Sequence, residues 1–181
     1  MNLFRKGRER AQAAALYGAI VGQARQPHFY LALEVADTED GRFDMILVHM
    51  FLVLERLTPE PPPFDRIVQA LFDRFFEDLD NTLREKSIGD TGVKIRIQKM
   101  VEAFYGRMAA YRKAAADHRP EIALAAALRT NLYRNRTPSD AAVTRMSAYV
   151  LDQLSQFREC QASAFLAGDA PFTRPWEGQA P

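Results

Sequence analysis

The sequence predicts an all-α protein: a single compact domain of about six to seven helices with a proline-rich C-terminal tail. Apolar residues recur at helical spacing through almost every stretch of the 181-residue chain. Prolines and glycines separate these stretches, and they are the residues that end helices. No alternating strand pattern and no internal repeat is convincing. We expect the helical domain to span 1–167, and the extended tail, with three prolines and two glycines, to span 168–181.

Two helices are expected at the N-terminus. Residues 8–25 are rich in alanine, and Pro27 ends that helix and opens a short one over 27–35. Three small residues lie four positions apart in the first helix: Ala14, Gly18 and Gly22. Such a row predicts that a neighbouring helix packs closely against this face.

The central helix is expected over 42–57, because this stretch is apolar nearly all round. A turn over 38–41 precedes it, and the proline-rich run 59–63 stops it. Its longest apolar run, 45–54, has ten residues, whereas a membrane span needs about 20. His49 interrupts this run, and we expect it to be a core histidine hydrogen-bonded to a neighbour rather than a metal ligand.

The remaining helices are expected over 64–86, 90–117, 120–133 and from Thr137 to about 165. Asp90 is the expected N-cap of the second of these, because aspartate accepts hydrogen bonds from the first free N–H groups of a helix. Thr137 is expected to cap the last one, with Pro138 at its first position. Phe172 and Trp176 are expected to hold the tail against the body.

Composition and charge exclude several classes of protein. Hydrophobic residues make up 48% and charged residues 26%, as in soluble globular proteins and unlike disordered ones. The single cysteine, Cys160, excludes a disulfide framework and a multi-cysteine metal site, and we expect its thiol to be inert. The net charge of +1 argues against a general nucleic-acid binder, so no DNA partner is expected. No signal-peptide core follows the basic N-terminus, and we take it as the start of the mature protein.

Known catalytic motifs are missing from the sequence: it has no glycine-rich phosphate loop, no nucleophile elbow and no His-Glu-x-x-His pair. We therefore expect a non-enzyme with no catalytic residue, cofactor or metal site. The alternative is a magnesium-dependent helical-bundle enzyme that acts on a diphosphate through Asp73, Glu77 and Asp80, which share a helix face. Such a site needs a second acidic cluster, and none is evident. Arg84 lies four residues after Asp80, where an ion pair is possible, which favours a solvated and partly neutralised face.

Charge is distributed unevenly along the chain. The net charge is +4 over 1–30, −8 over 31–90, +7 over 91–136 and −2 over 137–181. In the third segment, Arg96, Lys99 and Arg107 fall within about 80° of arc and predict a basic strip beside the apolar stripe. Tyr105 lies at the far edge of that stripe and is expected to be exposed. A basic strip suits an acidic protein, RNA phosphate or an anionic membrane surface, and the alternative is a face that only keeps the protein soluble.

Three groups of residues carry a resemblance to a known family. The first runs from Leu16 to Pro27 and continues with Phe29-Tyr30. The second comprises Asp37-Thr38 and Gly41-Arg42-Phe43-Asp44-Met45, running on to His49. The third comprises Leu83-Arg84-Glu85, Gly89-Asp90, Met100, Phe104-Tyr105-Gly106-Arg107 and Tyr111. In this order and spacing they resemble the ubiquinol–cytochrome c chaperone family, the assembly factors of respiratory complex III.

The resemblance implies a non-catalytic, all-helical chaperone that binds newly made cytochrome b and helps it enter complex III. It also implies a bacterial member that works at the cytoplasmic side of the inner membrane, peripheral to it. The candidate partner-binding residues are Arg96, Lys99, Arg107 and Tyr105. Their expected partner is cytochrome b as the client, with the ribosome or an anionic membrane surface as the further candidates. A helical adaptor with a different client is the remaining alternative, and the sequence leaves the oligomeric state open.

Overall fold

The computed structural model describes residues 2–85, 90–134, 136–168 and 170–173, and within them every regular element is an α-helix. The all-α prediction is therefore confirmed. The helices are α1 (Asn2–Ala24), α2 (Pro27–Leu31), α3 (Glu39–Leu57), α4 (Phe64–Glu85), α5 (Asp90–Ala115), α6 (Pro120–Asn131), α7 (Asp140–Glu159) and α8 (Ala162–Phe165). None of the helices in these ranges combines the length and apolar character that a membrane span requires.

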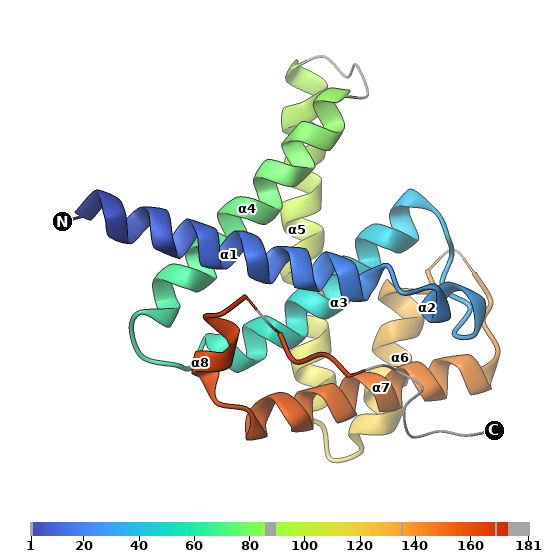
Figure 1. The fold of residues 1–181 in the computed structure, drawn as a ribbon. Helices are drawn as coiled ribbons and strands as arrows, with labels where there is room; N and C mark the ends of the chain where they lie inside the picture. Colours follow the sequence, from blue (N-terminus) through green and yellow to red (C-terminus); the bar gives the residue numbers. More distant parts are fainter. Residues whose placement is uncertain (1, 86–89, 135, 169, 174–181) are drawn as a thin grey trace.

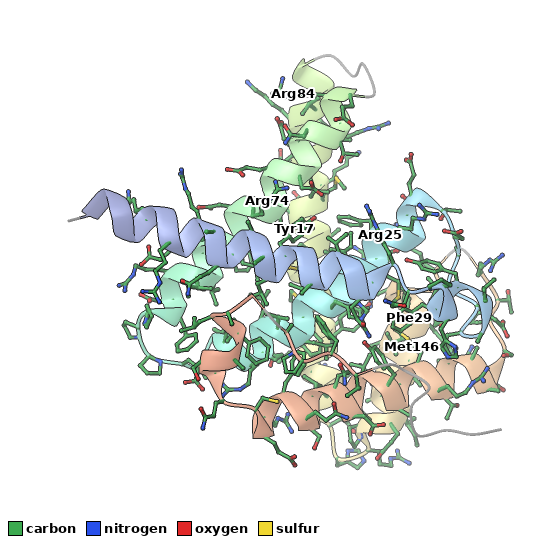
Figure 2. The ribbon with its side chains drawn as sticks, viewed as in Figure 1. Tyr17, Arg25, Phe29, Arg74, Arg84 and Met146 are labelled. Carbon is green, nitrogen blue, oxygen red and sulfur yellow. The ribbon has the colours of Figure 1, made fainter. Side chains whose placement is uncertain are left out.

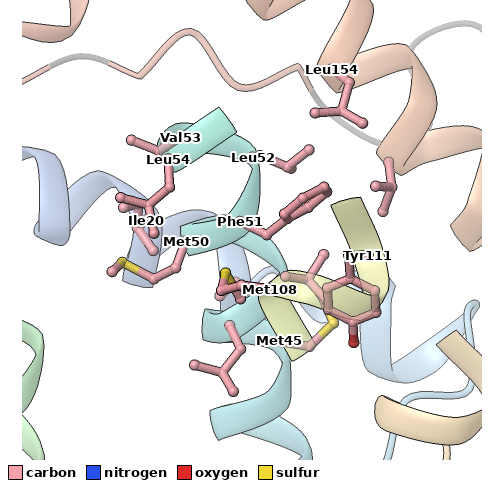
Figure 3. Close-up of a cluster of buried hydrophobic side chains, with 14 of the residues drawn as sticks. Ile20, Met45, Met50, Phe51, Leu52, Val53, Leu54, Met108, Tyr111 and Leu154 are labelled. Carbon is pink, nitrogen blue, oxygen red and sulfur yellow. The ribbon is translucent and has the colours of Figure 1, made fainter. Parts of the chain in front are cut away.

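Helix α3 is the centre of the hydrophobic core, as its all-round apolar pattern predicts. Its side chains pack against Ile20 of α1, Tyr111 of α5 and Leu154 of α7, all of them buried (Figure 3). The rings of Phe51 and Tyr111 lie 5.6 Å apart between centroids, which fixes α5 against this helix. A helix that is apolar on every side can be stable in water only when neighbours cover it on every side.

Helix α3 begins earlier than predicted, because the expected turn over 38–41 is its first turn and cap. The Thr38 side chain accepts a hydrogen bond from the backbone N–H of Gly41 at 3.2 Å, so the helix begins at Glu39. Glycine is required at position 41, since a Cβ there would lie 2.0 Å from the carbonyl oxygen of Ala36.

The row of small residues on α1 does not mark a helix contact, and that prediction is wrong. Ala14, Gly18 and Gly22 are all exposed, and a Cβ added at either glycine would meet nothing within 4 Å. Helix α1 instead crosses α4 with the face that carries Tyr17 (Figure 2). The Tyr17 hydroxyl donates to the Asp78 carboxylate at 2.9 Å, and the Arg74 guanidinium lies 5.6 Å from the centre of the tyrosine ring.

Helices α4 and α5 form an antiparallel hairpin whose far end projects beyond the rest of the domain (Figure 1). Aromatic contacts join the two helices. The ring centroid of Phe104 on α5 lies 5.3 Å from that of Phe72 and 5.6 Å from that of Phe75, both on α4. Arg84 marks the projecting end of α4 in Figure 2. Asp90 is the first residue of α5, and its predicted capping side chain and Gly89 lie outside the described part of the chain.

The start of α7 also differs from the prediction. Ser139, and not Thr137, is the N-cap: its Oγ accepts a hydrogen bond from the Ala142 N–H at 3.2 Å. Glu34 orients this cap, because its carboxylate accepts from the Ser139 N–H at 3.0 Å and from the Ser139 hydroxyl at 2.7 Å. Pro138 therefore precedes the cap. Serine and threonine are both favoured N-cap residues, so the sequence pattern alone did not exclude either position.

The chain after α7 folds back over α1. The Gln12 amide donates to the Leu166 carbonyl at 2.9 Å, and Gly168 then turns the chain with a φ of 84°. A Cβ at Gly168 would lie 2.4 Å from the Ala15 Cβ, so both the conformation and the close approach require glycine. Phe172 packs against the core as predicted, whereas Trp176 lies outside the described residues.

Candidate functional site

The exposed side of α5 carries most of the predicted partner-binding residues. Arg96 and Lys99 are exposed, and Tyr105 is 57% exposed, as its position at the edge of the apolar stripe predicts. The structure adds Ile95, a large apolar side chain that is 53% exposed. Helical spacing places Ile95 and Tyr105 away from Phe104, and this is the signal that could have identified Ile95 from the sequence.

Arg107 does not lie on this exposed side, and its place in a continuous basic strip is a prediction that the structure corrects. Its side chain is buried, and its Nη2 atom lies 3.0 Å from Oδ1 of Asp44 on α3. Arg107 also donates to the Ala103 carbonyl at 3.3 Å within α5. The physical reason is that Arg107 lies at the border between the exposed and buried sides of α5, where a buried carboxylate of opposite charge pulls it inward.

Asp44 is the centre of a buried ionic network that sequence reasoning missed. Besides Arg107, it binds Arg134, whose Nε donates to Asp44 Oδ2 at 3.1 Å. Burial raises the pKa of Asp44 to about 6, against the opposing effect of the two arginines. The network joins α3, α5 and the connection between α6 and α7. The available signal was the position of Asp44 directly before the apolar run 45–54.

We define the α5 outer face as Lys94, Ile95, Arg96, Lys99, Tyr105 and Gly106. All six residues are exposed, and a Cβ at Gly106 would meet nothing within 4 Å, so the helix backbone is accessible there. The Tyr105 ring stacks on Phe72 of α4, with 6.4 Å between ring centroids and 26° between planes. Tyr105 is thereby held in place while one side remains free. The α5 outer face carries three basic and two apolar side chains, with the exposed acid Glu102 on the same side of the helix, so it suits a partner that offers both polar and apolar groups.

The acidic residues of the alternative enzyme hypothesis lie on the outer side of α4. Asp80 forms the predicted ion pair with Arg84, and Asp73 accepts a hydrogen bond from Gln69 at 2.9 Å. Glu77 is exposed between them. Over the described ranges, no three His, Cys, Asp or Glu side chains are grouped so that they could hold a metal ion. This arrangement corresponds to the solvated, partly neutralised face that the sequence favours.

His49 is a fully buried core histidine with two hydrogen bonds, as predicted. Its Nδ1 lies 2.8 Å from the Met45 carbonyl, which can only accept, so Nδ1 carries the proton. Its Nε2 therefore accepts from the Tyr149 hydroxyl at 2.9 Å, and that hydroxyl accepts from the Gln23 amide at 3.1 Å. Burial lowers the pKa of His49 to about 4, because the charged imidazolium would be desolvated. This chain of hydrogen bonds connects α1, α7 and α3.

The structure is that of an all-helical protein with an exposed face on α5 that carries both basic and apolar side chains. Residues 31–173 match the family described as ubiquinol-cytochrome C chaperone. The chain belongs to this chaperone family. It is also similar to the crystal structure of the Cbp3 homolog from Brucella abortus, with 38% sequence identity, a TM-score of 0.83 and coverage of 97% of both chains. No curated protein matches the chain significantly.

Proposed function

We propose that this chaperone binds newly made cytochrome b and assists its assembly into ubiquinol–cytochrome c reductase, complex III. The family match over residues 31–173 carries the proposal, because that family is described as ubiquinol-cytochrome C chaperone and the match includes the whole of α5. The α5 outer face supports it, since a nascent membrane protein offers apolar segments flanked by polar loops. Lys99 and Arg96 would contact polar or anionic groups, and Ile95 and Tyr105 would contact apolar ones.

The same proposal places the protein at the cytoplasmic side of a bacterial inner membrane, peripheral to the bilayer. A surface that combines lysines with exposed isoleucine and tyrosine is compatible with an anionic interface. In this proposal, the same membrane is where the client is inserted. The α5 outer face would therefore meet its client next to anionic headgroups, and client binding is the role that we assign to it.

Deletion of the gene in the native host should lower the amount of assembled complex III and leave cytochrome b mRNA unchanged. The wild-type gene should restore assembly. An R96E/K99E/Y105A variant should restore less than about a third of it, because hot-spot side chains at the centre of an interface dominate its binding energy. Complex III is measured on native gels by its haem and subunit content.

The matched control is Arg158→Glu, which reverses an exposed charge on α7 and should complement like wild type. Normal complex III in the deletion strain would contradict the proposed function. Full complementation by the triple variant would show that the proposed function does not depend on the α5 outer face. Arg107 is left intact in this design, because its replacement would disturb the buried network rather than the surface.

A further inference from the structure

The segment 170–173 occupies a site that is built to hold an extended polypeptide. Two glutamine side chains from two different helices bind Thr173. Gln153 of α7 accepts from the Thr173 N–H at 3.1 Å and donates to the Thr173 hydroxyl, while Gln23 of α1 donates to the Thr173 carbonyl at 3.0 Å. Two of these three hydrogen bonds involve main-chain atoms, so the contacts recognise the backbone of an extended chain.

An aromatic side chain anchors the segment next to these hydrogen bonds. The Phe172 ring meets His49 edge-on and also contacts Phe157, with 5.3 Å between ring centroids in both pairs. Phe172 remains only partly buried. We call the surrounding residues, Gln23, His49, Gln153 and Phe157, the Phe172 site.

The Phe172 site presents hydrogen-bonding groups that fit the backbone of an extended occupant. With the segment in place Gln153 is completely buried, and its amide makes two hydrogen bonds to Thr173 and a third to Gln156. Gln23 links this site to the buried histidine, because its amide also donates to Tyr149 in the chain of hydrogen bonds that ends at His49. Another extended segment reproduces the hydrogen bonds to Gln153 and Gln23, whereas an apolar surface does not.

The segment itself is weakly anchored. The contacts described above come from one aromatic side chain, Phe172, and from one hydrogen-bonding residue, Thr173, which is exposed. The segment stays bound because it belongs to the same chain as the site, which gives it a high effective concentration there. A second segment with the same chemistry therefore competes for the site whenever the internal contact is weakened.

We propose that the Phe172 site binds an extended client segment in which an aromatic residue is followed by serine or threonine, and that residues 170–173 act as its internal competitor. That the segment belongs to a client rests on the proposed chaperone function. The specificity follows from the occupant in the structure: the aromatic ring contacts His49 and Phe157, and the hydroxyl accepts from Gln153.

A fluorescein-labelled peptide with the sequence of residues 168–174 tests the site in the full-length protein. In the F172A variant, the internal competitor loses its anchor, so the peptide should bind about tenfold or more tightly than it binds to wild type by fluorescence anisotropy. Thr173→Pro removes the N–H that Gln153 accepts and should have the same effect. A peptide whose phenylalanine is replaced by alanine should bind at least about tenfold more weakly.

Second substitutions in the F172A background establish where the peptide binds. F172A/Q153A and F172A/Q23A should each lose most of the binding, whereas F172A/Q98A, altered at an exposed glutamine on α5, should bind like F172A. Circular dichroism and melting temperature confirm that each variant is folded. Equal peptide binding by wild type, F172A and T173P would overturn the inference, and so would unchanged binding after both glutamine substitutions.

This test is independent of cytochrome b, so its failure is distinguishable from failure of the proposed function. If the peptide fails to bind, the inference about the Phe172 site is wrong. The chaperone role is still tested separately, by the amount of assembled complex III. Conversely, normal complex III in the deletion strain would contradict the proposed function even if the peptide binds.

Discussion

Replacing Arg107 with methionine should lower the free energy of unfolding by about 3–5 kcal/mol. The substitution removes one of the two cations that compensate the buried carboxylate of Asp44, while the apolar volume of the side chain is largely retained. The remaining partner, Arg134, is partly exposed and cannot by itself replace the lost contact. The destabilisation therefore comes from the buried Asp44 carboxylate, which keeps only one of its two cationic partners.

Urea unfolding measured at pH 7.5 checks this expectation, and Arg96→Met is the matched control on the same helix. Because Arg96 is exposed, its substitution should change the free energy of unfolding by less than about 0.5 kcal/mol. If the two variants were equally stable, Arg107 would behave as a surface residue. The buried network would then not stabilise the packing of α5 on α3.

In wild type, the contribution of His49 to the free energy of unfolding should fall by about 2 kcal/mol between pH 7 and pH 5. The His49→Gln variant should lack this fall. The ordinary pKa of histidine is 6.5, and burial lowers that of His49 to about 4. The unfolded chain therefore takes up the proton first as the pH falls. The contribution of neutral His49 to stability is complete above pH 6.5 and is lost as the pH falls toward 4.

Asp44 acts in the opposite direction, so the wild-type profile alone does not isolate His49. Its pKa is raised from 3.8 to about 6, which means that the folded state takes up this proton first and gains stability on acidification. Wild type and His49→Gln both contain Asp44, so the difference between their unfolding free energies at pH 7 and pH 5 cancels its effect. Parallel pH profiles for the two proteins would show that His49 does not titrate differently in the folded and unfolded states.

The overall architecture could be predicted from the sequence because each helix has its own periodic signal. The apolar run through residues 45–54 required burial on all sides, and a histidine within it required hydrogen-bonding partners. The exposure of Tyr105 and the ion pair between Asp80 and Arg84 follow from the geometry of single helices. These features depend on local spacing alone.

The errors arise where two helices meet. The burial of Arg107 depends on Asp44, a residue more than sixty positions earlier that reaches it only when α3 packs on α5. The exposure of Gly18 and Gly22 depends on which side of α1 turns toward α4, and the larger Tyr17 and its neighbours decide that. The Phe172 site could not be predicted, because Gln23 and Gln153 show their common role only when α1 and α7 lie on either side of the same segment.

Affinity capture from detergent-solubilised membranes of the native host tests the central claim most directly. The full-length tagged chaperone should retain cytochrome b as its dominant partner, identified by mass spectrometry, and the R96E/K99E/Y105A variant should retain about tenfold less at equal expression. Arg158→Glu should capture as much as wild type. Capture of a different dominant protein, with no cytochrome b above the level of an untagged strain, would contradict the account.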